Sequence, residues 1–465
     1  MRENFPFRTE DVLGLLGYST GNKDSLYIQC PFCRSRKKPL HFDMRTSVYR
    51  CNKNPEHHGN ILTFYRDLAG CEDNKAAYRE ICQRLGMDTH TYQKQTFSDE
   101  EKKEKDVSLP YDVVRTDKAY RKILTKSFLS SKNKQELLAR GFSVEDIVKL
   151  NYKTMPERDG LEIYKFVEEL SLENPSGIPG FYRSKKGAWM FMHGKRGIIV
   201  PYRDFYGRIQ GAQVRKDNEV RQIVDGEMEH KYYFISARYK RDGGAAYQFA
   251  HYAGEFREKE NGEKSLYIPN GAIVMTEGGM KIDLFHCLTK QPGIGIPGVN
   301  CENVLLRELP ILKEHGVHTI YLGFDMDRMM NINVSSALAK IEKIILEHGL
   351  ECTYLKWDTT YHTMHEEEKT LQTDTMFVFT PETFDHDMED GVIEQTLERA
   401  FSLGKKRIMF AMKNSKEATQ ENLNRYNTLK GICARYGFLE CTPIYWELKH
   451  KGIDNFYAYK IKGIE

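Results

Sequence analysis

Two short stretches decide the fold of this chain: AIVMTEGGMKIDLFHCL at residues 272–288 and HTIYLGFDMDR at residues 318–328. Each begins with a β-branched, apolar run of strand length, and the first run passes directly into a helical pattern. The alternation continues through further strand and helix patterns, at 293–299, 303–316, 335–349 and 352–357. Strands that alternate with helices predict a doubly wound α/β domain with a largely parallel sheet.

Two residues and one short repeat refine this pattern. Pro310 lies inside the helical pattern 303–316, so we expect that helix to be kinked or restarted there. Gly349 follows the helical pattern 335–349 as a natural helix-terminating glycine. The letters GLECT (349–353) return as FLECT (438–442), each shortly before a tryptophan, so a decayed repeat of the last strand unit is one interpretation.

Acids follow two of the predicted strands directly. Glu277 follows the strand in T-E-G-G, and Asp325 and Asp327 follow the other in F-D-M-D. Ligand and metal sites of open α/β sheets form at the carboxyl ends of strands. Residues two apart in an extended segment point the same way, and hard oxygen ligands suit Mg²⁺ shared with substrate phosphates. Acids after strands also cap helices, but two such groups together favour a metal site.

A second group has the spacing of a zinc site. Cys30 and Cys33 form a C-x-x-C knuckle, Cys51 follows an alternating strand pattern, and His57 and His58 lie shortly beyond it. Three thiolates and one imidazole satisfy tetrahedral Zn²⁺. We take His57 as the fourth ligand, with His58 as the alternative. Cys71, Cys82, Cys287 and Cys433 are better explained as small buried apolar residues.

Composition and charge exclude several protein classes. The chain has 465 residues, of which 40% are hydrophobic and 29% charged, so it is globular and has room for several domains. No signal peptide or membrane span is evident, which leads us to expect a cytoplasmic protein. Net charge is only +3, but residues 183–221 carry ten Lys or Arg against three acids, and 358–400 carry twelve acids against two basic residues. This segregation suits a polyanion-binding face beside an acidic region, although two unrelated solvated surfaces would look the same.

The pattern along the chain predicts an order of parts. They are a zinc-binding module (1–92), a polar linker (93–110), a helical segment (111–185), a basic segment (186–270), an α/β domain (271–357), an acidic insertion or degenerate repeat (358–445) and a C-terminal end (446–465). The acidic segment could fold as a second Rossmann-like layer or act as a DNA mimic on the basic face.

These motifs together resemble the DnaG-type primases. Glu277-Gly-Gly and Asp325-Met-Asp327 resemble the acids of the TOPRIM fold, and RGIIVPYRDFYGRIQGAQVR (196–215) followed by HKYYFIS (230–236) resembles the basic part of the primase core. The zinc module also comes before a linker, as it does in primases. Phage, plasmid and mobile-element primases look nearest. The resemblance covers roughly residues 25–357 and 446–460.

The resemblance implies synthesis of short RNA primers on single-stranded DNA from nucleoside triphosphates, with structural Zn²⁺ and catalytic Mg²⁺ or Mn²⁺. Glu277, Asp325 and Asp327 would hold the catalytic metal, and Asp454 would supply a further ligand. Phosphate charge would be neutralised by Lys231, Arg208 and Arg215, and template DNA would lie along a basic surface formed by Arg196, Arg203, Arg208 and Arg215. The zinc module would read the start site, with help from Arg34, Arg36, Lys37 and Lys38.

The sequence also departs from the family. The zinc ligands follow the order Cys, Cys, Cys, His, whereas the replicative enzymes usually have histidine second. Asp454 is displaced by an insertion of some ninety residues, and Asn455 stands where an acid is common. No Walker A motif is evident, so a helicase would come from another chain.

Two other functions compete with primer synthesis. A TOPRIM nuclease would use the same acids but has no need of the 196–236 segment. A non-catalytic protein that binds single-stranded DNA for a partner would explain the zinc module, the basic segment and Asn455. A topoisomerase fits less well because the chain has no room for strand-passage domains.

Overall fold

The computed structural model describes residues 7–20, 25–33, 40–44, 47–53, 57–71, 73–87, 112–155, 157–192, 194–221, 223–224, 227–238, 240–259, 262–299 and 301–464. The chain divides into two compact units. The first combines 1–105 with 362–367 and 374–446, and the second combines 106–361 with 368–373 and 447–465. Within these described residues, no helix has both the length and the apolar character needed to cross a membrane.

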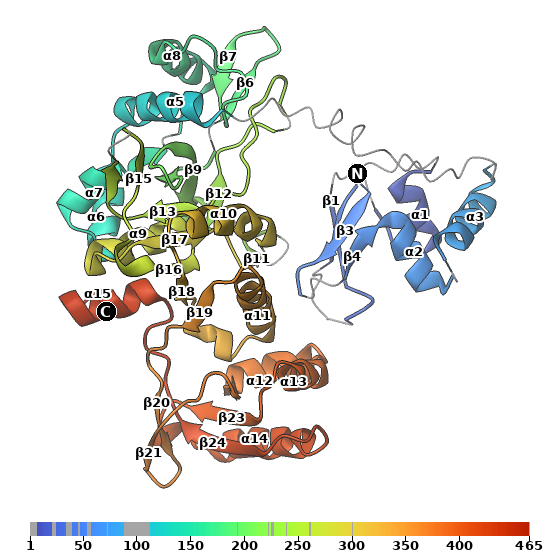
Figure 1. Ribbon diagram of the computed structural model, residues 1–465. Coiled ribbons are helices and arrows are strands. Elements are labelled where there is room, and N and C mark those ends of the chain that lie inside the picture. The colour runs from blue at the N-terminus through green and yellow to red at the C-terminus, as the bar shows by residue number, and fades with distance from the viewer. Residues whose placement is uncertain are drawn as a thin grey trace. The chain divides into compact units, whose positions relative to one another are not determined.

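The N-terminal module is a small antiparallel sheet covered by helices (Figure 1). Its elements are α1 (Thr9–Leu15), β1 (Ser25–Ile28), β2 (Leu40–Asp43), β3 (Val48–Cys51), β4 (His58–Asn60), α2 (Ile61–Ala69) and α3 (Asn74–Leu85), with strand order β1-β2-β3-β4. The aromatic side chains of Phe42, Tyr49 and Phe64 pack against one another in its core. Asn60 and Thr63 form a capping box that fixes the start of α2 directly after β4.

An antiparallel sheet of order β12-β9-β8-β5 begins the second unit. Its strands are β5 (Lys153–Met155), β8 (Gly197–Arg203), β9 (Ile209–Lys216) and β12 (Tyr232–Phe234). The helices around it are α5 (Val113–Lys126), α6 (Ser131–Ala139), α7 (Val144–Leu150) and α8 (Gly160–Leu170). Residues of α5 and α8 pack on one face, with Ile199 and Val214, whereas α6 and α7 pack on the other, with Ile198 and Val200.

Short two-stranded antiparallel ribbons also belong to this unit. They are β6 (Phe181–Arg183) with β7 (Trp189–Phe191), β10 (Ile223–Val224) with β11 (Glu227–Met228), and β14 (Phe256–Glu258) with β15 (Lys264–Leu266).

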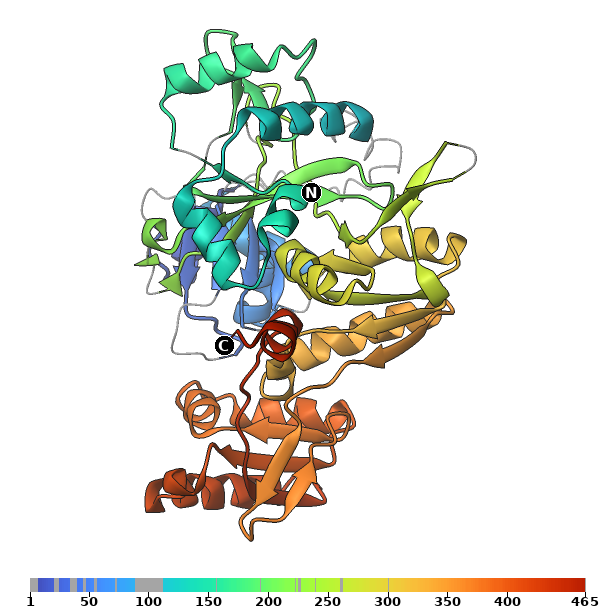
Figure 2. The same cartoon turned by 90° about the vertical axis from the view of Figure 1, so that its left-hand side faces the viewer.

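The second sheet of this unit is the predicted α/β domain. Its strands, in the order β13-β17-β16-β18-β19, are β13 (His251–Ala253), β17 (Gly293–Ile296), β16 (Ala272–Glu277), β18 (Thr319–Leu322) and β19 (Glu351–Tyr354). All neighbours except the edge strand β13 are parallel, which confirms the predicted fold class. Apolar residues of α10 (Glu302–Glu314) and α11 (Ile332–Glu347) share one core with the sheet. Two more helices, α9 (Gly279–Thr289) and α15 (Ile453–Lys462), pack against each other (Figure 2).

The expectation of a restart at Pro310 is wrong. Helix α10 runs without interruption through Pro310. Proline removes the hydrogen bond to the carbonyl four residues earlier, at Leu306. Leu306 is half exposed, so water can satisfy that carbonyl and the helix continues. The helix α11 ends as expected, with Gly349 in the left-handed conformation just beyond it.

Residues 360–445 add a further mixed sheet, of order β21-β20-β24-β23-β22. It contains β20 (Thr360–Thr363), β21 (Glu368–Thr370), β22 (Met376–Phe379), β23 (Arg407–Met412) and β24 (Glu440–Tyr445), with helices α12 (Pro381–Glu389), α13 (Ile393–Ser402) and α14 (Gln420–Cys433). Strands β22, β23 and β24 are parallel, in a Rossmann-like layer. The two Glu-Cys-Thr echoes both start strands that pair in parallel with the preceding strand, β19 with β18 and β24 with β23.

A buried polar contact joins the two sheets of the second unit. His251 Nε2 lies 2.9 Å from Asp283 Oδ1, and the Tyr152 hydroxyl donates to Asp283 Oδ2 at 2.7 Å. The Arg203 backbone N–H donates to His251 Nδ1, so His251 donates through Nε2. Burial alone would raise the pKa of Asp283, but the His251 and Tyr152 contacts hold it below its ordinary value.

We expect Asp283→Asn to lower the free energy of unfolding by about 3 kcal/mol at pH 7, because the amide oxygen can replace only one of the two carboxylate oxygens that accept from His251 and Tyr152. A depressed folded-state pKa contributes stability that is present above the unfolded value, about 3.9, and is lost as pH falls through the folded value. The difference between variant and wild type should therefore shrink below about pH 4. Urea denaturation from pH 3 to pH 7, with exposed Glu347→Gln as the control, tests this, and a pH-independent difference would contradict it.

Candidate functional site

The zinc ligands predicted from the sequence come together. Cys30, Cys33, Cys51 and His57 place their ligand atoms within 4.8 Å of one another. Cys30 Sγ lies 3.5 Å from His57 Nδ1, and the Sγ atoms of Cys33 and Cys51 are 3.8 Å apart. Two sulfurs bound tetrahedrally at about 2.3 Å from one zinc ion are about 3.8 Å apart, so the group fits a structural zinc site.

The local fold explains why His57 is chosen over His58. Cys51 ends β3, and its N–H donates to the His57 carbonyl across the turn. His58 is already the first residue of β4, where it lies opposite Arg50 in the ladder. The basic residues beside the knuckle, Arg34, Arg36, Lys37 and Lys38, lie outside the described residues.

The acids of the α/β sheet lie at the edge where its strands end. Glu277 is the last residue of β16, and Asp325 follows β18 after two residues. Desolvation by the surrounding protein atoms raises the pKa of Glu277. The positive charge of Lys281 lowers this pKa, whereas the negative charges of Asp325 and Asp327 raise it. The Glu277 side chain is nevertheless open to solvent, so a ligand can reach it.

Two lysines contact these acids. Lys281, one helical turn after Glu277 on α9, forms an ion pair with Asp325 Oδ1. Lys451 Nζ lies 2.7 Å from Asp327 Oδ2 and 4.0 Å from Asp325 Oδ2. Among the described residues, the cysteine and histidine group is the one whose ligand atoms are gathered as for a single metal ion, and the acids are less closely gathered.

Asp454 belongs to the same neighbourhood. It lies in the first turn of α15 and is fully buried. A Cβ built on Gly452 would lie 2.5 Å from Asp454 Oδ1 and 3.3 Å from Asp325 Oδ1, so both oxygens border one small space. Asp454 Oδ2 accepts from Arg140 at 3.1 Å, while Oδ1 has no hydrogen-bond partner among the described residues. Burial raises the pKa of Asp454, with Lys281 and Arg140 opposing.

Arg140 connects the acids to a partly buried group of cations. Arg215 is 3% exposed and its Nη1 forms an ion pair with Glu136, while its Nε makes no hydrogen bond to any described residue. Burial, followed by the charges of Arg215 and Arg140, lowers the pKa of Lys231 to about 8. Cationic donors that lack hydrogen-bond partners are what a phosphate group requires. We define Arg140, Arg215 and Lys231 as the cation cluster.

The strand register divides the predicted basic surface between two ends of one hairpin. Gly197 pairs with Lys216, whereas Arg203 pairs with Ile209. Arg196 and Arg215 therefore lie at one end, and Arg203 and Arg208 lie at the other, about 20 Å away at 3.3 Å per residue.

The four arginines also differ in their contacts. The guanidinium of Arg196 bonds to buried Asp217 at 2.8 Å, and that of Arg203 donates to the Leu150 carbonyl. Arg208 pairs with Asp204 and lies over the Tyr206 ring. Only Arg215 adjoins Lys231 and Arg140, so the structure does not bring Arg208 to that cluster. The roles of all four in DNA binding stay predictions.

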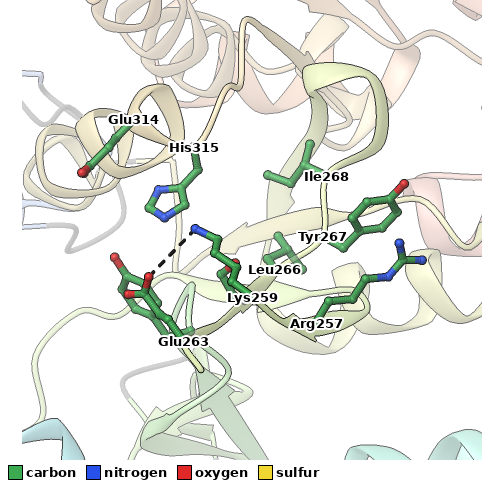
Figure 3. A pocket seen from close by; sticks show the side chains of 10 residues that line it. Arg257, Lys259, Glu263, Leu266, Tyr267, Ile268, Glu314 and His315 are labelled. Atoms are coloured by element: carbon green, nitrogen blue, oxygen red, sulfur yellow. Dashed lines mark ion pairs between the residues drawn. The ribbon is translucent and has the colours of Figure 1, made fainter. Parts of the chain in front are cut away.

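Arg208 lines a surface cavity of its own. The cavity has a volume of about 550 Å³ and also contains Arg121, Tyr206 and Lys264. It shares Tyr206 and Glu263 with a neighbouring cavity of about 460 Å³. In Figure 3 the His315 ring and the Lys259–Glu263 ion pair face each other across that neighbouring cavity. Aromatic and cationic side chains together suit a nucleic-acid strand at this end of the hairpin.

Sequence reasoning missed three residues of the site. Lys281 and Lys451 stand beside the recognised motifs, in E-G-G-M-K and H-K-G-I-D, and their charge was the available signal. Arg140 lies in a helical pattern 314 residues before Asp454, and its sequence context carries no signal of this contact.

Several solved structures are similar to this chain. The zinc-binding and RNA polymerase domains of the Aquifex aeolicus primase share 14% identity, over 98% of this chain and 95% of that one, with a TM-score of 0.37. A DnaG primase catalytic domain bound to single-stranded DNA shares 14% identity over 52% and 74%, with a TM-score of 0.34. The E. coli primase catalytic core shares 16% identity over 53% and 71%, with a TM-score of 0.32.

No protein-family model matches the chain, and no curated protein matches it. These three structural similarities are all at low identity and low TM-score.

We expect Cys33→Ser to lower bound zinc from about one ion per chain to almost none, because the remaining ligands cannot close the tetrahedron. The N-terminal module should then become sensitive to proteolysis, since metal binding contributes to its folding. Atomic emission spectroscopy and limited proteolysis measure both effects. Cys71→Ser is the matched control, because Cys71 lies in the same module and contacts Glu80 instead. Full zinc content in Cys33→Ser would contradict the assignment.

Proposed function

We propose that this chain is a DNA primase, which synthesises short RNA primers on single-stranded DNA by metal-dependent nucleotidyl transfer. One observation carries the proposal: the acids at the strand ends adjoin a partly buried cation cluster through the contact of Arg140 with Asp454. Acids that hold a divalent ion and cations that hold phosphate are the two requirements of a nucleotidyl transfer site.

The donor chemistry of the acids fits a divalent metal. Glu277, Asp325 and Asp327 offer hard carboxylate oxygens, which Mg²⁺ and Mn²⁺ prefer, and Asp454 adds a buried oxygen without a hydrogen-bond donor. A bound ion would polarise the α-phosphate and lower the pKa of the attacking 3′-hydroxyl. Glu277 is open to solvent, so it would meet the incoming nucleotide first.

The cation cluster would hold the triphosphate. Arg215 is held through Nη1 by Glu136 and its Nε still lacks a hydrogen bond among the described residues, so it is oriented before the substrate arrives. Lys231 and Arg140 would add positive charge as pyrophosphate leaves, an electrostatic role that needs no movement of the protein. Arg208, at the far end of the hairpin, would contact the template instead.

The remaining parts fit this function. The zinc module would contact the template near the start site, and a replicative helicase would be supplied by a separate chain. Phage, plasmid or mobile-element replication is the setting that the sequence motifs favour. We also propose that the protein acts in the cytoplasm, where such replication takes place.

A second candidate is a protein that binds single-stranded DNA without catalysis. The pairing of Asp325 and Asp327 with lysines favours it, because a lysine ammonium occupies space that a metal ion would need. A nuclease would use the acids but would leave the cation cluster without a purpose.

Synthesis on single-stranded DNA with labelled ribonucleotides and Mg²⁺ separates these functions. We expect short RNA products from the wild type and a loss of at least 100-fold in Asp325→Asn/Asp327→Asn, since two carboxylate ligands are lost. Glu347→Gln, on the exposed face of α11, should retain full activity. Shortened template in place of RNA would indicate a nuclease, and DNA binding without either product would indicate the non-catalytic function.

The pKa of Lys231 predicts a pH dependence of nucleotide binding. Lys231 is charged below about pH 8 and neutral above it, so its attraction for phosphate should fall as pH rises through about 8. We expect nucleoside triphosphate affinity to weaken several-fold between pH 7 and pH 9 in the wild type. Lys231→Met should bind weakly at both values. Equilibrium binding of a fluorescent triphosphate measures this, and a parallel pH response in the variant would contradict it.

A further inference from the structure

Three of the carboxylates at the strand ends form ion pairs with cationic side chains. Lys281 pairs with Asp325, Lys451 pairs with Asp327, and Arg140 pairs with Asp454. These cations come from α9, from the segment before α15, and from the segment directly after α6. The number of metal ions that the site can accept therefore depends on which cations can leave.

The two lysines differ in their freedom to leave. The Lys451 side chain is 62% exposed, so it can swing into water and release Asp327. The Lys281 side chain is only 21% exposed, and its helix neighbours Met280 and Ile282 are buried.

The balance of charge then limits the number of divalent ions that the acids can hold. Asp454 and Arg140 neutralise each other as a buried pair. Glu277, Asp325 and Asp327 together carry three negative charges, and fixed Lys281 leaves two, which one divalent ion balances. A second ion among the same side chains would leave two uncompensated positive charges, which a partly buried site resists.

We infer that Lys281 is a built-in cation of this site, and that it limits the acids to a single divalent ion in the absence of nucleotide. The inference rests on the proposed function for the identity of the ion. Glu277 and Asp327 would hold the ion once Lys451 is displaced, while Lys281 holds Asp325 in position. In the usual two-metal arrangement a second ion would stabilise the leaving phosphates. Here Arg215 and Lys231 of the cation cluster carry that charge.

Mn²⁺ binding to the full-length, zinc-loaded protein without nucleotide tests the inference. Free Mn²⁺ is counted by electron paramagnetic resonance, and the ions that remain bound to Asp325→Asn/Asp327→Asn are subtracted as background. We expect one site-specific Mn²⁺ in the wild type. Lys281→Glu adds a fourth carboxylate to the three acids, so this variant should bind two Mn²⁺ ions. Lys281→Met is a second variant, for use if Lys281→Glu does not fold. It should show an additional, weaker Mn²⁺ site.

Lys451→Met is the matched control, because Lys451 contacts the same aspartates from the exposed side. It should bind the single Mn²⁺ several-fold more tightly and still bind only one. Two site-specific ions in the wild type, or one ion in a folded Lys281→Glu, would overturn the role of Lys281 and leave the proposed function standing. No Mn²⁺ above background in any protein would instead overturn the metal site of the proposed function.

Discussion

A buried charge needs a partner, and the organisation of the second unit depends on one such pair. Asp454 is fully buried, and a single guanidinium, that of Arg140, reaches it at 3.1 Å. These residues are 314 positions apart, on the C-terminal helix and just after α6. Loss of one partner would leave the other charged in a dry environment, so the pair favours docking of the C-terminal helix beside the acids.

This constraint explains how a long insertion can be tolerated. The chain leaves the α/β sheet after β19 and returns at α15, and the folded sheet of β20 to β24 lies between. Trp357 donates to the His450 carbonyl, and Asp358 accepts from the His450 N–H, so the outgoing and returning segments are bonded to each other. Because these contacts close the two ends, the residues between them can fold as their own layer without displacing Asp454.

The sequence predicted those features that depend on local patterns. The strands that precede Glu277 and Asp325 are periodic and β-branched, and the zinc ligands have a characteristic spacing, so both groups were identified with the correct elements. The contacts of Arg140, Lys281 and Arg208 could not be predicted in this way. They depend on strand register and on docking between helices, which a charge pattern along one segment does not encode. The basic segment looked like one surface, but the hairpin register separates Arg208 from Arg215.

The position of the charges also bears on how such a site works. Nucleotidyl transfer requires positive charge near the departing phosphates, and a protein can supply it with mobile ions or with fixed side chains. Fixed side chains are oriented in advance, but they can be buried only if nearby acids compensate them. Glu136 compensates Arg215, Asp454 compensates Arg140, and Asp325 compensates Lys281. Arg140 and Lys281 are thus stabilised by acids that they partly withdraw from metal binding, so the site gains preorganised positive charge at the expense of metal occupancy.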